Sequence, residues 1–313
     1  MINFEKEIAR LEAVINRERY GEEEGKRMEK VELNLVITRG MVSNIQTPLK
    51  RYEINGVSKS AVNFVGTLKV VLFWPEDLEL VTDSPGRRRR YLDFVLIQTD
   101  REYRRNLISY EKAIRHRNRV LEAIRDGGAH STQLIFWDQL IIKTGQYLST
   151  KREEYLNFVN TQKMSSSERA MPEYHLVYDR SEISQARLLQ YKEEEIASGN
   201  TLVGPHRDDF QFRIMNLDLS IKGEEYRDLS QFGSRGEQRL GILWLKMGEL
   251  LYIETISSQR PVLLLDDIFS ELDHEHLKLI FNMIGMHQTI MSTTDLHHID
   301  KKIMRDVELI KLP

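Results

Sequence analysis

The pattern of apolar and polar positions changes twice along the chain and divides it into three regions. Over the first region, residues 1–83, the pattern is typical of short strands. Residues 31–37 alternate apolar and polar side chains, as in a strand with one buried face. Asn55-Gly56 between two strand-like runs is a hairpin signal. The continuous apolar run at 70–74, which Pro75 ends, predicts a more buried strand.

The second region, residues 84–198, follows the spacing of α-helices. Apolar residues recur at this spacing in two stretches, first at Tyr91, Leu92, Val95, Leu96, Tyr103, Leu107, Tyr110 and Ile114, and then at Leu134, Trp137, Ile141, Leu148 and Tyr155. Gly127 and Gly128 break the run between them, and the polar segment at 163–169 predicts a loop. The sequence shows no internal repeat and no long heptad array. We therefore expect an arm of antiparallel helices inserted between two parts of a sheet domain.

The third region, residues 199–313, alternates strands and helices, and two motifs in it could carry chemistry. The first is the run Pro-Val-Leu-Leu-Leu at 261–265, which leads into Asp266 and Asp267. The run predicts a strand buried on both faces, with both carboxylates at its carboxyl end, where open α/β sheets bind ligands. Two adjacent carboxylates there can hold Mg²⁺ and orient a water molecule. The alternative is a core strand that runs into an acidic turn.

The second motif is Phe-Gly-Ser-Arg-Gly-Glu-Gln-Arg at 232–239. Ser234 and Glu237 match a capping box, S-x-x-E, and a buried helix should follow because apolar residues then recur at Leu240, Leu243, Trp244, Met247, Leu250 and Leu251. Since many ordinary helices begin this way, a purely structural role is one interpretation. A binding role would explain Gly236, which weakens the first turn but lets a ligand approach the backbone. A serine hydroxyl at a helix N-terminus also favours an anion.

Composition narrows the classes of function. The 313 residues, 41% hydrophobic and 30% charged, are enough to bury a sizeable core. The formal net charge of −3 excludes a globally basic nucleic-acid binder, so any DNA contact must come from a local patch. With no cysteine, disulfides, thiolate metal sites and cysteine nucleophiles are excluded. Without a signal-peptide layout or an apolar run of membrane-spanning length, we expect a cytoplasmic protein with no membrane partner.

Taken in order, the two motifs resemble the signature and Walker B motifs of ABC-type and SMC-type ATP-binding heads, with Ser-Glu-Leu-Asp at 270–273 as the D-loop. Further segments resemble the RecF family more specifically. They are Val-Leu-Phe-Trp-Pro-Glu-Asp-Leu at 71–78, Ser-Pro-Gly-Arg-Arg-Arg-Arg-Tyr-Leu-Asp at 84–93, Thr-Leu-Val-Gly-Pro-His-Arg-Asp-Asp at 201–209 and Ser-Thr-Thr-Asp at 292–295. The resemblance spans essentially the whole chain. It implies an α/β fold, an ABC/SMC-type P-loop ATPase head that lacks its Walker A segment and carries an inserted helical arm.

The resemblance also implies ATP and Mg²⁺ as cofactors and assigns roles at the end of the predicted strand. Asp266 would help to hold Mg²⁺, mostly through water. Asp267 takes the position of the carboxylate that polarises the attacking water. After the next strand, where many ABC heads carry a switch histidine, this chain has hydroxyl residues. A sensor of the γ-phosphate would therefore be one of Ser292, Thr293 and Thr294.

Other residues would act across a homodimer that forms on ATP binding. The signature would contact the γ-phosphate of ATP bound to a second subunit through Ser234, Gly236, Glu237 and Gln238. Two residues of the D-loop, Ser270 and Asp273, would line the dimer seam. For the segment at 204–209 two roles remain open, namely a structural turn pinned by its Arg and Asp residues and a nucleotide or dimer contact.

A phosphate-binding loop, G-x-x-x-x-G-K-[ST], does not occur in this sequence. The nearest candidate, Gly-Glu-Glu-Glu-Gly-Lys-Arg at 21–27, has three consecutive glutamates that would repel a phosphate. In RecF-like proteins the loop lies near the N-terminus. We therefore expect that the chain starts downstream of the loop, through an internal start, a fragmentary gene or a degenerate paralogue. On this interpretation, the chain alone should bind ATP–Mg²⁺ only weakly.

Four consecutive arginines at 87–90 follow Ser84 and Pro85, which match the N-cap and first position of a helix. Cations in a first turn oppose the helix dipole, at a cost of about 0.3–1 kcal/mol each when they are exposed. Either carboxylates of this chain or phosphates of a partner would compensate these charges. Our candidate DNA contacts come from this run and from the predicted arm, and they are Arg87, Arg88, Arg115 and Arg119.

The function implied by the resemblance is that of an ATP-dependent DNA-binding protein of recombinational repair, replication restart and the SOS response. RecF proteins recognise gapped DNA, where single and double strands meet, and with RecO and RecR they help to load RecA. The alternative from another class is a non-hydrolysing DNA-binding or dimerisation subunit, since this chain retains the motifs that act in trans. An SMC-like structural ATPase is disfavoured by the short arm.

Overall fold

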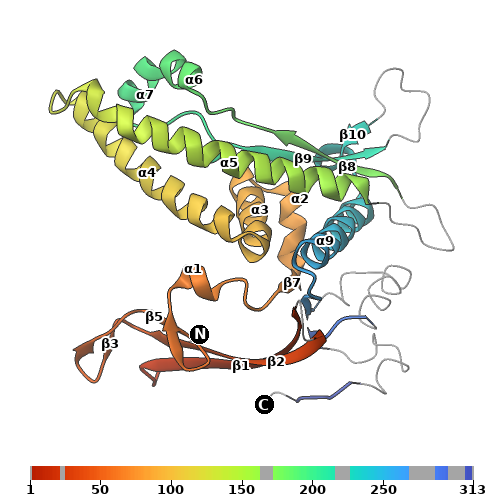
Figure 1. Cartoon of the computed structure of the whole chain (residues 1–313). Helices are drawn as coiled ribbons and strands as arrows, with labels where there is room; N and C mark the ends of the chain where they lie inside the picture. Colours follow the sequence, from red (N-terminus) through yellow and green to blue (C-terminus); the bar gives the residue numbers. More distant parts are fainter. Residues whose placement is uncertain are drawn as a thin grey trace. The chain divides into compact units, whose positions relative to one another are not determined.

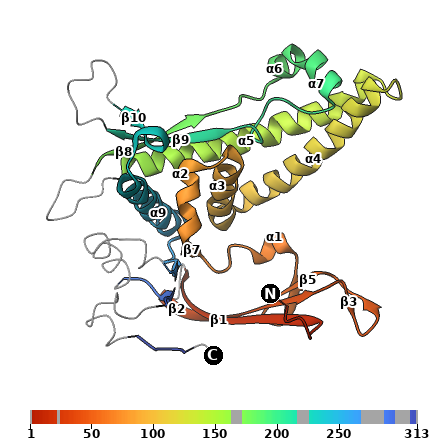
Figure 2. The ribbon, with the colours of Figure 1, turned by 180° about the vertical axis from the view of Figure 1, so that it is seen from behind.

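The structure, a computed structural model, describes residues 2–21, 25–162, 172–215, 226–267, 286–294 and 307–311 (Figures 1 and 2). The chain divides into two compact units, Met1–Lys69 and Val70–Pro313. The polar segment at 163–169 and the D-loop residues Ser270 and Asp273 lie outside the described residues.

The N-terminal unit is built on an antiparallel sheet with the strand order β1-β2-β5-β6. Its elements are β1 (Ile8–Gly21), β2 (Gly25–Thr38), β3 (Met41–Val42), β4 (Ile45–Gln46), β5 (Lys50–Ile54), β6 (Val57–Lys59) and α1 (Ala61–Phe64). Asn55 and Gly56, between β5 and β6, have φ angles of 52° and 74°. A two-residue type I′ turn needs positive φ at both positions, so the predicted hairpin is confirmed.

The C-terminal unit contains a parallel sheet, an antiparallel sheet and the long helices. Its helices are α2 (Glu79–Thr82), α3 (Pro85–Thr99), α4 (Arg101–Arg125), α5 (Leu134–Thr161), α6 (Gln185–Gln190), α7 (Lys192–Ser198), α8 (Leu229–Phe232) and α9 (Arg235–Ser257), with the 3-10 turns η1 (Pro75–Leu78) and η2 (Ser131–Gln133). Its strands are β7 (Val70–Phe73), β8 (Tyr174–Asp179), β9 (Asp209–Met215), β10 (Tyr226–Asp228), β11 (Val262–Asp266) and β12 (Thr289–Ser292).

The strand predicted before the two aspartates is β11, the middle strand of the parallel sheet. It pairs with β7 on one side and with β12 on the other, both in parallel. Leu263 and Leu265 are buried on one face, whereas Val262 and Leu264 on the other face are half-buried. Because all three strands run in the same direction, their carboxyl ends meet at one edge of the sheet, where α/β folds place their ligands.

The predicted helical arm is formed by α4 and α5, which lie side by side as a long hairpin (Figure 1). The α4 helix begins after Asp100, whose carboxylate accepts hydrogen bonds from the amides of Glu102 and Tyr103. It ends at Arg125, and Gly127 follows with a φ of 78°, so the predicted break between the two helices is confirmed. In the described ranges we find no helix with both the length and the apolar character needed to cross a bilayer.

The three regions expected from the sequence differ from this division in two ways. Residues 70–83, expected in the first region, belong to the C-terminal unit, because β7 pairs with β11. The region expected to be helical, 84–198, contains β8, which pairs antiparallel with β9. Tyr174 and Leu176 of β8 are buried on the same face, as in a strand with one covered side. The arm region and the third region therefore share one sheet.

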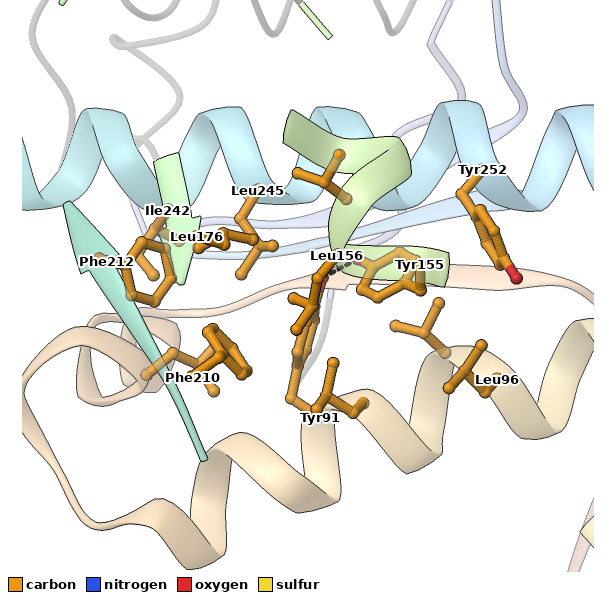
Figure 3. Packing of buried hydrophobic residues seen from close by; sticks show 14 of the residues in the cluster. Tyr91, Leu96, Tyr155, Leu156, Leu176, Phe210, Phe212, Ile242, Leu245 and Tyr252 are labelled. Atoms are coloured by element: carbon orange, nitrogen blue, oxygen red, sulfur yellow. Dashed lines mark hydrogen bonds between the residues drawn. The ribbon is translucent and has the colours of Figure 1, made fainter. Parts of the chain in front are cut away.

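The core of the C-terminal unit joins α3, α5, β8, β9 and α9 (Figure 3). Tyr91 of α3 and Tyr155 of α5 are buried, and their hydroxyl groups lie 2.5 Å apart in a hydrogen bond. Around this pair pack apolar residues from all five elements, among them Leu96, Leu156, Leu176, Phe210, Phe212, Ile242 and Leu245. The helix that begins at the signature, α9, is thus held in the same core as the arm.

The far end of α4 is attached to α7 through a buried arginine. Arg117, 2% exposed, donates from Nε to Asp138 of α5 at 2.7 Å, from Nη2 to Glu195 of α7 at 2.7 Å and from Nη1 to the hydroxyl of Thr201 at 2.9 Å. The other carboxylate oxygen of Glu195 accepts from the amide of Leu202 at 2.8 Å. Buried charges are tolerated when they are paired and hydrogen-bonded in this way.

Replacing Glu195 by Gln should lower the free energy of unfolding by about 3 kcal/mol, because it leaves the buried charge of Arg117 undercompensated. Urea denaturation followed by circular dichroism measures this loss. The matched control is Glu194→Gln on the same helix, since Glu194 is exposed and forms no ion pair with any described residue. The control should change stability by less than about 0.5 kcal/mol. Equal losses in the two variants would contradict a special role for the buried pair.

Candidate functional site

Three of the predicted residues come together at the carboxyl edge of the parallel sheet. Asp266 is the last residue of β11, and its Oδ1 accepts a hydrogen bond of 2.5 Å from the hydroxyl of Ser292, the last residue of β12. The amide of Asp267 donates to the carbonyl of Ser292 at 3.2 Å. Asp267 has a φ of 45°, a left-handed conformation that aspartate tolerates better than most residues. The chain therefore turns sharply just after the strand.

The oxygen atoms at this edge suit a hard divalent cation. Asp266 and Ser292 are exposed and Asp267 is half-buried, so carboxylate and hydroxyl oxygens are available, which are ligands that Mg²⁺ prefers. The described residues contain no group of three or more His, Cys, Asp or Glu that could hold a metal alone. A Mg²⁺ ion here would complete its shell with water and phosphate oxygens, its usual arrangement at nucleotide sites. Thr293, half-buried, and Thr294, exposed, follow directly.

The signature motif forms the predicted capping box at the start of α9. The hydroxyl of Ser234 accepts from the amide of Glu237 at 3.2 Å, and Oε2 of Glu237 accepts from the amide of Ser234 at 2.7 Å. Arg227 donates to the other oxygen of Glu237 at 2.8 Å. Partial burial acts to raise the pKa of Glu237, but the bonds from Ser234 and the charge of Arg227 outweigh it, so the pKa lies below its ordinary value.

Three of the four signature residues stabilise the turn through hydrogen bonds, and two of the four, Ser234 and Gly236, are exposed. Gln238, 6% exposed, donates from Nε2 to the carbonyls of Leu229 and Gly233 at 3.2 and 3.3 Å. Gln238 and Glu237 are thus engaged within this chain. Ser234 and Gly236 are exposed, and a Cβ added at Gly236 would meet no atom within 4 Å. A ligand can therefore approach the backbone of the first turn.

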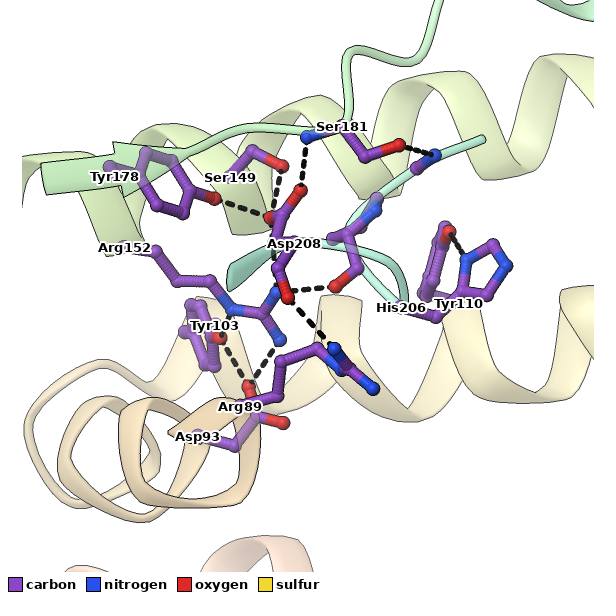
Figure 4. Close-up of polar contacts among 12 residues, drawn as sticks. Arg89, Asp93, Tyr103, Tyr110, Ser149, Arg152, Tyr178, Ser181, His206 and Asp208 are labelled. Carbon is purple, nitrogen blue, oxygen red and sulfur yellow. Dashed lines mark hydrogen bonds and ion pairs between the residues drawn. The ribbon is translucent and has the colours of Figure 1, made fainter. Parts of the chain in front are cut away.

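The segment at 204–209 is held by Asp208, which is fully buried (Figure 4). The carboxylate of Asp208 accepts hydrogen bonds from the hydroxyl of Ser149 at 3.0 Å, from Nη1 of Arg152 at 3.1 Å, from the amide of Ser181 at 2.8 Å and from the hydroxyl of Tyr178. With all these donors belonging to the chain itself, the carboxylate has no room for an external ligand. Of the two roles left open for this segment, the geometry therefore favours a structural turn.

The first two arginines of the run at 87–90 are neutralised inside the chain. Arg87 pairs with Glu79 and, at 3.3 Å, with Asp83. Arg88, 9% exposed, forms a bidentate ion pair with Asp209 at 2.7 and 2.9 Å and donates from Nη1 to the carbonyls of Leu80 and Asp83. Every guanidinium nitrogen of Arg88 is occupied. For Arg87 and Arg88 the compensating groups are those of this chain, and we do not retain Arg88 as a DNA contact.

Arg115 and Arg119, the candidates on the arm, remain accessible. Both are exposed on α4, one helical turn apart. No ion pair to either residue occurs within the described part of the chain. They differ in their surroundings, because Arg115 lines a pocket between α3 and α4 and Arg119 is not part of its lining.

Two pockets were not predicted from the sequence. One of about 350 Å³ lies beyond the carboxyl end of β7 and is lined in part by Trp74, Phe94 and Lys246. Lys246 is buried and pairs with Asp77 at 3.2 Å and with Glu249 at 3.3 Å, and burial raises the pKa of Glu249 to about 7. The signal for this cluster was a lysine and a glutamate three residues apart within a helix predicted to be buried. The second pocket, about 400 Å³, lies between α3, α4 and the turn at 204–207.

Comparison with known proteins assigns the chain to a family, although no family model matches it. The DNA replication and repair protein RecF of Thermomicrobium roseum is 36% identical over 85% of this chain and 72% of its own length. The chain belongs to the RecF family. RecF of Herpetosiphon aurantiacus is 37% identical over 80% of this chain and 66% of its own length, and RecF of Moorella thermoacetica 34% over 87% and 73%.

Two solved structures of the recombination mediator protein RecF in the RecFOR pathway have the same fold. The RecF-ATPrS structure matches with a TM-score of 0.78 and 25% identity over 95% of this chain and 77% of that chain. The RecF-ATP structure matches with a TM-score of 0.77 over 94% and 76%. The predicted fold, an α/β head of the ABC/SMC type with an inserted helical arm, is confirmed.

Ser234→Ala should lower the free energy of unfolding by about 1 kcal/mol, because it removes the acceptor of the N-terminal cap of α9. Urea denaturation is again the measurement. Ser84→Ala is the matched control, since Ser84 is the N-cap residue of α3 but its side chain makes no capping hydrogen bond. The control should stay within about 0.5 kcal/mol of the parent. A Ser234→Ala variant as stable as its parent would show that the capping bond contributes nothing.

Proposed function

We propose that this chain belongs to an ATP-dependent DNA-binding protein that acts in recombinational repair and replication restart. It would recognise DNA gaps, where single and double strands meet, and act with RecR and RecO in loading RecA. Its membership of the RecF family supports this function, as does its similarity to RecF structures named for bound nucleotide. The observation that carries the ATP-dependent part is the meeting of Asp266, Asp267 and Ser292 at the carboxyl edge of the parallel sheet.

ATP would lie between two copies of the chain and act as a switch for dimer formation. At the sheet edge, Asp266 would hold Mg²⁺, which neutralises phosphate charge when bound, and Asp267 would orient the attacking water. The partner copy would present Ser234 and Gly236 to the γ-phosphate. The exposed first turn of α9 supports this role, because the free N–H groups and the positive end of a helix favour an anion.

A second candidate function is a DNA-binding or dimerisation subunit that does not hydrolyse ATP. The signature supports it, because this motif would act on nucleotide bound to a partner copy. The two functions differ in what happens when a phosphate-binding segment is supplied. In a chimera that places this segment of a RecF relative before residue 1, the first function predicts hydrolysis and the second does not.

In that chimera, Asp267→Asn should leave ATP binding largely intact and lower the hydrolysis rate by on the order of 10²-fold or more, because the water loses the carboxylate that orients it. Isothermal titration measures binding, and phosphate release measures hydrolysis. The control is Asp126→Asn at the exposed C-terminal end of α4, which should bind and hydrolyse ATP like the parent chimera. Equal rates in the parent and the Asp267→Asn chimera would remove Asp267 from the proposed chemistry.

Ser234→Arg should block ATP-induced dimerisation, since a bulky cation would occupy the place of the partner's γ-phosphate. Sedimentation of the chimera with a slowly hydrolysed ATP analogue gives the fraction of dimer. Ser131→Arg, at the exposed turn between α4 and α5, controls for the added charge and bulk and should dimerise like the parent. Undiminished dimerisation of the Ser234→Arg chimera would overturn the role of the signature.

A further inference from the structure

The pocket between α3, α4 and the turn at 204–207 is rich in arginine. Arg89 and Arg90 line it from α3, Arg115 lines it from α4, and Arg152 of α5 contributes part of the lining. His206 lines the pocket from the turn. Figure 4 shows Arg89 and Arg152 close to the buried Asp208. It also shows the hydrogen-bonded pair of Tyr110 and His206.

Most carboxylates near this pocket are already engaged. Asp93 accepts from Nη2 of Arg152 at 2.9 Å and from the hydroxyl of Tyr103 at 2.5 Å. Asp208 is occupied by its four donors, and Asp209 by Arg88. Glu111 is the remaining carboxylate in the lining, and it is exposed. The pocket therefore has more positive than negative charge available for a ligand.

Three guanidinium groups at the pocket keep donors for a ligand. Arg89 uses Nη1 for the carbonyl of Asp208 at 2.8 Å, and Arg90 uses Nε for the carbonyl of Gly86 at 3.3 Å. Arg115 is exposed and has no ion pair among the described residues. Burial, and to a smaller extent the nearby charge of Arg152, lowers the pKa of Arg89. An anion bound here would offset the repulsion between Arg89 and Arg152. Guanidinium groups match phosphate oxygens with paired, charge-assisted hydrogen bonds.

The wall formed by the turn is fixed before any ligand arrives. Nε2 of His206 lies 2.9 Å from the carbonyl of Thr201 and must donate to it, so Nδ1 accepts from the hydroxyl of Tyr110 at 2.8 Å. Gly204 has a φ of 120°, and a Cβ there would lie 2.5 Å from the Tyr110 hydroxyl, so only glycine fits. Burial lowers the pKa of His206 to about 4, which keeps the ring neutral near pH 7. A rigid wall reduces the entropy lost on binding.

We infer that this pocket binds one phosphate group through Arg89, Arg90 and Arg115. Its volume of about 400 Å³ lies within the range of small-ligand sites and leaves room for groups esterified to the phosphate. A phosphate of the DNA backbone and the phosphate of a free nucleotide share this chemistry. The DNA form of the inference rests on the proposed function, and the experiment has a separate arm for each source.

The first arm uses inorganic phosphate alone. Isothermal titration of the full chain should show millimolar binding that is lost in Arg115→Gln and in Arg90→Gln. Lys112→Gln is the matched control, at an exposed position of the same helix as Arg115 but outside the lining, and it should bind like the parent. Arginine, lysine and glutamine have similar helix propensities, and circular dichroism should show the same helix content in all variants. No phosphate binding by the parent, or equal binding by all variants, would overturn the inference.

The second arm uses a gapped DNA duplex over a series of salt concentrations. Arg115→Gln should weaken binding by about tenfold and reduce the slope of log K against log salt by roughly one, as expected for one lost phosphate contact. The control Lys112→Gln should have a clearly smaller effect. Equal losses in the two variants would overturn the pocket as a DNA site, while salt-dependent binding by the parent would still support the proposed function. If pocket variants lose inorganic phosphate but bind DNA like the parent, the pocket is a site for free phosphate compounds.

Discussion

The buried ion pair between Arg152 and Asp208 is the constraint on which the C-terminal unit depends. Their side chains are 3% and 0% exposed, and desolvating two charges to this extent is costly unless every polar atom finds a partner. Arg152 satisfies this condition by donating also to Asp93 of α3, to the hydroxyl of Tyr103 of α4 and to the carbonyl of Pro205. One guanidinium on α5 thereby fixes two neighbouring helices and the turn at 204–207.

The same constraint gives three consecutive arginines of α3 different environments. Asp208 and Asp209 follow the turn, and the position of the turn decides which cations of α3 they reach. Arg88 points inward to a bidentate contact with Asp209, and Arg89 reaches only the backbone carbonyl of Asp208. Arg90, a residue further on, is exposed. A single helical turn thus supplies both a structural ion pair and cations available at the surface.

Local features of the fold could be predicted because local chemistry fixes them. The Asn55-Gly56 hairpin, the break at Gly127 and the capping box at Ser234 each follow from a few adjacent residues. The chain also places Asp266 at the end of a parallel strand as its apolar run predicts. Its short contact with Ser292 depends on the register of β11 against β12, which the sequence does not specify.

Features made by distant segments could not be predicted in this way. Strand β8 lies between helices, and it becomes a strand because β9 offers a partner about 30 residues later. The burial of Arg88 had no local signal, since four identical side chains stand in a row. The phosphate pocket likewise requires α3, α4 and the turn to be assembled. Sequence patterns report periodicity and caps, whereas these features depend on which elements pack together.

The pairing of β8 with β9 limits how far this protein can be divided into modules. The hydroxyl of Tyr174, the first residue of β8, donates to the carbonyl of Glu237 in the signature turn. The amide of Ser181, two residues after β8, donates to the carboxylate of Asp208. A fragment ending near residue 198 would leave β8 without its partner strand. The remaining fragment would expose the edge of β9, and exposed strand edges promote aggregation. Grafting the arm of a relative onto this head would therefore have to bring β8 with it and preserve both of these junctions.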